Sequence, residues 1–145
     1  MKKLMLPLLF LSLIGFMNPL QAQSTDGHEA LKQHINTVVE QVEEAESPEQ
    51  KRDVLDESLS DIITAIDRVS ERRSVSSADK KGLAELKKQL TERRNELNGI
   101  NGFKKVPNNQ LNQYANFIQQ DMEQADAVTI SVTTLLLIII ILLLI

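Results

Sequence analysis

The segment that decides the fold is Ser47–Ser70, which reads SPEQKRDVLDESLSDIITAIDRVS. It opens with a serine that can cap a helix, a proline suited to the first helical position, and a glutamine three residues after the serine. Its apolar residues then recur at alternating spacings of four and three, at Leu55, Leu59, Ile62, Ile66 and Val69. This rhythm predicts an amphipathic helix over about 48–73.

The same rhythm continues on both sides and predicts three further helices, at about 27–46, 78–98 and 108–127. No run with the alternating pattern of a strand occurs. The links at Glu46–Ser47 and Ser74–Ser77 are short, so consecutive helices must run antiparallel. We therefore expect an all-α fold, a small antiparallel bundle or set of coiled-coil hairpins with three to four helices. The apolar stripe of the fourth helix is the weakest, so it either packs on the other three or stands free as a stalk.

The N-terminus has the order of a secretory signal peptide. Lys2 and Lys3 precede an apolar run from Leu4 to Met17, and a small residue follows at Ala22. This pattern predicts a cleaved signal over residues 1–22 and an exported protein of the periplasm or cell surface, with residues 23–127 as its ectodomain. The alternative is an uncleaved N-terminal anchor.

The C-terminus is uniformly apolar. Residues Val128–Ile145 carry no charge, and Leu135–Ile145 contains only leucine and isoleucine. A helix over 128–145 would be about 27 Å long, close to the thickness of a bilayer core of about 30 Å. We therefore predict a transmembrane helix over 128–145 that continues the fourth helix without a break. A helix buried in the core and a sorting signal that is later removed are the alternatives, and the first is disfavoured because this segment has no polar face.

Charge is segregated along the chain. Acidic residues dominate up to Asp67, whereas basic residues, many in adjacent pairs, dominate from Arg68 to Lys105. The bases form a candidate surface for an anionic partner. The alternative is that they pair with the acidic helices or are only solvated. The candidate surface comprises Arg68, Arg72, Arg73, Lys80, Lys81, Lys87 and Arg94.

Few residues could carry chemistry. The chain has no cysteine, two histidines and five aromatic residues. His28 and His34 are about 240° apart around one helix, so they cannot share a metal ion from that helix. No serine lies in a nucleophile motif of the Gly-x-Ser-x-Gly type. We therefore expect no catalysis, no cofactor, no metal site and no nucleic-acid partner.

The function that best fits these features is that of a membrane-anchored helical interaction protein of the cell envelope, such as an adaptor, assembly factor or structural subunit. Its partners would be the membrane, through the C-terminal span, and another envelope protein or a second copy. The alternative is a helical bundle that senses a ligand and acts through a membrane partner.

Overall fold

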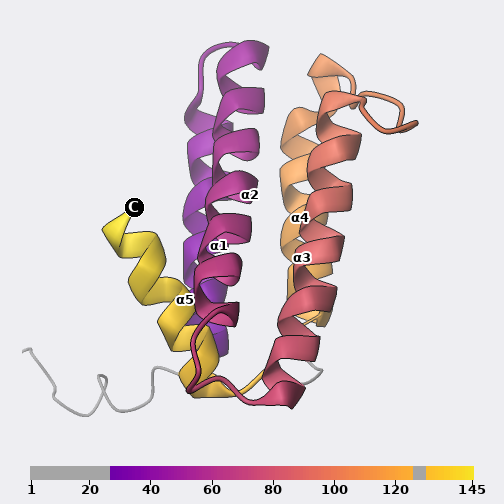
Figure 1. Ribbon diagram of the computed structural model, residues 1–145. Helices are drawn as coiled ribbons and strands as arrows, with labels where there is room; N and C mark the ends of the chain where they lie inside the picture. Colours follow the sequence, from indigo (N-terminus) through magenta and orange to yellow (C-terminus); the bar gives the residue numbers. More distant parts are fainter. Residues whose placement is uncertain (1–26, 126–129) are drawn as a thin grey trace, which may run out of the picture.

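The structure is a computed structural model that describes residues 27–125 and 130–145. These residues form helices and connecting turns, without any strand (Figure 1). The helices are α1 (Gly27–Glu44), α2 (Pro48–Ser70), α3 (Ser77–Asn98), the single 3₁₀ turn η1 (Asn108–Gln110), α4 (Leu111–Ala125) and α5 (Val132–Leu144). The prediction of an all-α bundle is confirmed for this part of the chain.

Side-chain caps begin α2 and α3. The Ser47 hydroxyl accepts a hydrogen bond from the Gln50 backbone N–H at 3.2 Å, and the Gln50 side chain accepts one from the Glu46 N–H at 3.0 Å. Ser76 accepts in the same way from the Asp79 N–H at 3.1 Å. Each cap satisfies a backbone donor that has no partner inside its helix, so the start of both helices is set locally.

The ends of these helices are set differently. α2 ends at Ser70, three residues before the expected position 73, because the chain turns there and buries Val75 in the core. α3 ends at Asn98, and its C-cap, Gly99, has a φ of 65°, which lies in the left-handed region. A Cβ atom at Gly99 would lie 2.6 Å from Cβ of Lys105, so both the backbone angle and the returning loop require glycine.

The core is built from the apolar stripes that the sequence predicts. α1 packs beside α2, α3 packs on α2, and α4 packs on α1 (Figure 1). The stripe residues meet in one continuous cluster in which each side chain is at most 9% exposed. They are Leu31, Ile35, Val38 and Val42 of α1, Leu55, Leu59, Ile62, Ile66 and Val69 of α2, Leu83, Leu86, Leu90 and Leu97 of α3, and Leu111, Tyr114, Ile118 and Met122 of α4.

The fourth helix is part of the bundle and not a free stalk. Ile118 and Met122 of α4 are buried, at 6% and 4% exposure. The Gln119 side chain donates a hydrogen bond to Asn36 of α1, and Lys32 of α1 lies 3.8 Å from Glu123. The helix therefore packs against α1 through apolar and polar contacts together.

The expectation of one unbroken helix from Asn109 to Ile145 is wrong. Ser131 has an extended backbone, with φ −63° and ψ 150°, and its hydroxyl accepts a hydrogen bond from the Thr134 N–H. It is the N-cap of a separate helix, α5, of 13 residues. The hydroxyl side chain competes with the helical conformation at this position and starts a new helix in a new direction.

α5 folds back along the bundle and packs against α1 and α2 (Figure 1). Its inner face is buried at Thr134, Leu135, Ile138 and Ile141. Among residues 27–125 and 130–145, no helix combines the length and apolar character needed to cross a bilayer. The predicted signal peptide (1–22) and residues 128–129 of the predicted span lie outside the described residues.

Replacing Ile66 with alanine should lower the free energy of unfolding by about 2–5 kcal/mol, because this side chain is 1% exposed and its removal leaves a cavity. Ile100 is 48% exposed in the loop after α3, so Ile100→Ala should change stability by less than about 0.5 kcal/mol. Chemical denaturation followed by circular dichroism measures both. Equal losses in the two variants would contradict the assignment of the core.

Candidate functional site

Five of the seven predicted surface bases gather at one end of the bundle. Arg68 lies in the last turn of α2, and Arg72 and Arg73 lie in the turn between α2 and α3. Lys80 and Lys81 lie in the first turns of α3. All five are exposed, and none forms a side-chain hydrogen bond or ion pair with the described residues. We call this group the basic end. It lies at the turn between α2 and α3, at the bottom of the view in Figure 1.

The other two bases, Lys87 and Arg94, form partly exposed ion pairs with carboxylates of α2. Lys87 Nζ lies 2.6 Å from Oδ1 of Asp67, and Arg94 Nε lies 2.8 Å from Oδ1 of Asp56. Both contacts connect α3 to α2. The structure therefore does not gather all seven predicted residues into one free surface, because acidic residues of α2 stand opposite this part of α3.

Asp56 is the acidic centre of the contact between α2 and α3. Arg94 donates two hydrogen bonds to it, and the Asn98 side chain donates a third at 2.7 Å. The hydrogen bonds from Arg94, supported by the one from Asn98 and by the charge of Arg94, lower the pKa of Asp56 below its ordinary value. The contact is partly exposed, so it positions the helices more than it stabilises them.

A second polar cluster lies beside the basic end and fastens α5. The Asp79 carboxylate, only 7% exposed, accepts hydrogen bonds from the Ser131 N–H at 3.0 Å and from the Ser131 and Thr134 hydroxyls at 2.6 Å each. These bonds, led by the one from the Ser131 hydroxyl, lower the pKa of Asp79. A carboxylate also stabilises the N-terminus of α5 through the helix dipole. We call these three residues the Asp79 latch.

Arg93 connects α3 to α4. Its position on the apolar stripe allows two interpretations from sequence, a register-setting contact or a side chain that reaches out to solvent. In the structure Arg93 Nε lies 2.9 Å from Asp121 of α4, its Nη1 lies 3.1 Å from Glu96, and its guanidinium stacks 4.7 Å from the Phe117 ring centre. The side chain thus fixes the register of α4 on α3.

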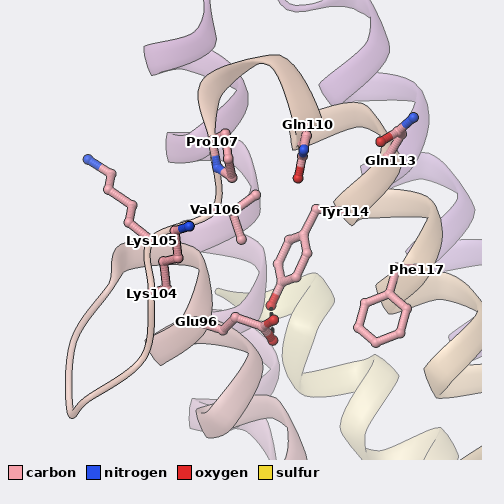
Figure 2. Close-up of a pocket in the computed structure, with 9 residues that line it drawn as sticks. All are labelled: Glu96, Lys104, Lys105, Val106, Pro107, Gln110, Gln113, Tyr114 and Phe117. Atoms are coloured by element: carbon pink, nitrogen blue, oxygen red, sulfur yellow. Dashed lines mark hydrogen bonds between the residues drawn. The ribbon is translucent and has the colours of Figure 1, made fainter.

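A hollow of about 450 Å³ opens between the end of α3, the following loop and the start of α4. Figure 2 shows Glu96, Tyr114 and Phe117 on its wall, with Lys104 and Lys105 at its edge. The Tyr114 hydroxyl lies 2.7 Å from the Arg93 carbonyl and 3.1 Å from Glu96. Burial, and then the negative charge of Glu96, raise the pKa of Tyr114, so this phenol stays protonated and acts as a hydrogen-bond donor.

Both histidines, His28 and His34, lie on α1. His34 lines a second hollow, between α1 and α2, together with Asp61 and Ser58. Burial lowers the pKa of His34, and the charge of Asp61 opposes this effect. In the part of the chain that the structure describes, no three His, Cys, Asp or Glu side chains are close enough to hold a metal ion.

Comparisons of the chain with family models, curated proteins and solved structures find no match. The candidate sites therefore stand on the geometry of this chain alone.

Sequence reasoning missed two polar side chains that hold the tertiary structure together. Asp79 stands in the first turn of α3, where an acidic residue is common, and it also binds Ser131 and Thr134 at the start of α5. Arg52 donates hydrogen bonds to the carbonyls of Leu97 and Val106 and to Asn108, and so ties α2 to the loop after α3. From the sequence, a basic residue among acidic residues of a helix is expected to be exposed to solvent. No local pattern distinguishes such a residue from one that donates tertiary hydrogen bonds, as Arg52 does.

The pKa shift of Asp56 predicts how stability depends on pH. Because the folded-state pKa is below the unfolded one, the contribution of Asp56 is complete above about pH 5 and is lost as the pH falls further. Asp56→Asn should therefore flatten the fall in thermal stability between about pH 5 and about pH 3, by about 0.5 kcal/mol. Asp53→Asn is the control, because Asp53 is exposed and forms no ion pair with described residues. An equal slope in both variants would contradict the role of Asp56.

Proposed function

We propose that the protein is a membrane-anchored, extracytoplasmic helical interaction protein of the cell envelope, serving as an adaptor, assembly factor or structural subunit. The single observation that carries this proposal is the basic end, five exposed cations without partners in the described residues, beside the start of the leucine- and isoleucine-rich helix α5. The cations suit an anionic surface and the apolar segment suits a bilayer.

The position of the basic end supports this proposal. The Asp79 latch joins the start of α3 to the start of α5, so the apolar C-terminal segment begins at the same end of the bundle as the bases. In this proposal residues 128–145 provide the anchor when they meet a bilayer, and residues 1–22 direct export. The basic end then faces the headgroups and any protein embedded among them.

The opposite end of the bundle provides a control for the basic end. It carries the turn before α2 and the loop between α3 and α4 (Figure 1). Lys104 and Lys105 lie in that loop, and both are exposed. They provide a matched pair of cations for testing whether position, and not charge alone, defines the contact surface.

The hollow beside Tyr114 favours a second candidate function, a bundle that senses a small ligand and acts through a membrane partner. The hollow joins an aromatic wall to both signs of charge, which suits a small polar ligand. Native mass spectrometry of the purified chain separates the two candidates: a bound small molecule that is lost in Tyr114→Phe would favour sensing.

A reporter that is active only outside the cytoplasm, inserted between Gly99 and Gly102, should be active in cells. Ile100, Asn101 and Gly102 are exposed and lie outside any helix, so this loop tolerates an insertion better than a helix does. Enzyme activity of the reporter is the measurement. An inactive reporter in a fusion that is stably produced would refute the extracytoplasmic location.

A photo-crosslinking residue in place of Ser77, which is exposed between Arg73 and Lys80 of the basic end, should form an adduct with an envelope protein in whole cells. Replacing Lys80 and Lys81 with glutamine should reduce this adduct at least about fivefold, because two charge-assisted contacts are lost. The matched control replaces Lys104 and Lys105 with glutamine and should leave the adduct unchanged. Mass spectrometry identifies and quantifies the adduct. No adduct at Ser77, or equal loss in both variants, would contradict an interaction role for the basic end.

A further inference from the structure

α5 is only half covered by the bundle. Its inner face is buried, but Ile140 is 51% exposed, Leu143 81% and Leu144 78%. Every residue from Leu135 to Ile145 is leucine or isoleucine, so the outer face offers nothing that hydrogen-bonds to water. A contiguous apolar surface of this kind marks an interaction site in a folded protein.

The polar attachment of α5 is confined to one end. Asp79 accepts three hydrogen bonds from Ser131 and Thr134, and all of them lie at the first turn of the helix. Beyond Thr134 the segment has no polar side chain. The remaining attachment is apolar contact with α1 and α2, which a hydrocarbon environment can replace without a change in chemistry.

A steric feature also marks how closely α5 lies on α1. A Cβ atom added at Gly27 would lie 2.7 Å from the Val132 carbonyl oxygen and 2.8 Å from Cβ of Leu135. Both distances are too short, and the first involves backbone that cannot move aside. The docked position of α5 therefore depends on the absence of a side chain at residue 27.

We infer that α5 is a releasable tail, which docks along α1 and α2 in water and transfers into a bilayer that contains anionic lipid. The Asp79 latch opposes release, and the basic end, beside the latch, brings anionic headgroups to the point where the tail detaches. This inference rests on the membrane anchor of the proposed function and adds how the anchor is held before insertion.

The apolar surface fits a bilayer better than a second copy of the chain. A bilayer surrounds α5 and covers both faces of the helix, whereas a second copy would cover only one more face. The uniform leucine and isoleucine surface also has no residue that would fix the register of such a dimer. The unpaired cations at the same end complement anionic lipid. Two copies that packed side by side in a parallel arrangement would bring their basic ends together, and these like charges would repel.

The test uses the Leu143→Cys variant of the full chain, in which a polarity-sensitive dye is attached to this single thiol because the chain has no other cysteine. It is mixed with vesicles of phosphatidylcholine, with or without phosphatidylglycerol. Hydrogen exchange of residues 132–145 measures docking in water, and the dye emission measures transfer into lipid. We expect slow exchange without lipid, and a blue shift only with the anionic vesicles.

Two variants weaken docking by independent means. Asp79→Asn removes the charge of the latch, and Gly27→Ala introduces the clash with α5. Each should speed exchange in α5 and lower the lipid concentration for half-transfer about tenfold, the effect expected for losing charge-assisted hydrogen bonds or close packing. Asp53→Asn changes an exposed carboxylate that has no hydrogen bond or ion pair with α5, and it should match the parent chain. Unchanged exchange in α2 and α3 shows that each variant remains folded.

Several results would overturn the inference. If the dye emission is already blue-shifted without lipid, and if this shift increases with protein concentration, the apolar face is covered by a second copy. If both variants match the parent chain in exchange and in transfer, the Asp79 latch and Gly27 do not hold α5 in its docked position. Transfer with no protected, docked state in water would leave the anchor of the proposed function intact but refute release, whereas no transfer at all, into either kind of vesicle, would refute both the release and the anchor.

Discussion

The structure depends on the burial of one apolar stripe on α2. Leu55, Leu59, Ile62 and Ile66 are each at most 3% exposed, and α2 contacts α1, α3 and α5 around its circumference. An isolated helix of this composition would be marginal in water, so its stability comes from these partners. The short link before α2 and the turn after it bring α1 and α3 alongside as antiparallel neighbours, and the rest of the bundle is built on this group of three helices.

Charge is used in two ways on this frame. Where α3 runs beside α2, basic residues meet carboxylates: Lys87 meets Asp67 and Arg94 meets Asp56. Where the chain turns from α2 to α3, the five residues of the basic end are exposed and have no hydrogen-bond or ion-pair partner among the described residues. Basic residues along α3 therefore connect it to α2, whereas the basic residues at the turn between the two helices are exposed.

Much of this arrangement could be predicted from local patterns, and the limits have physical reasons. The Ser47 and Ser76 caps and the core stripe residues follow from rules that act within one helix turn, so they are visible in sequence. The seven candidate bases are also visible, but their division into two paired and five unpaired residues depends on which helix lies opposite. The Asp79 latch joins residues 52 and 55 positions apart, and no local pattern connects them.

The sequence by itself determined the helical class, the antiparallel order of the first helices, the residues of the core and the apolar character of the C-terminus. These properties depend on periodicity, capping and link length, which are local. Only the tertiary structure decided that α4 packs on α1, that Ser131 starts a separate helix, and that α5 folds back along α1 and α2. A uniform leucine and isoleucine helix has no polar face to indicate its direction, so its place depends on the contacts at its end, the buried carboxylate of Asp79 and the bare backbone of Gly27.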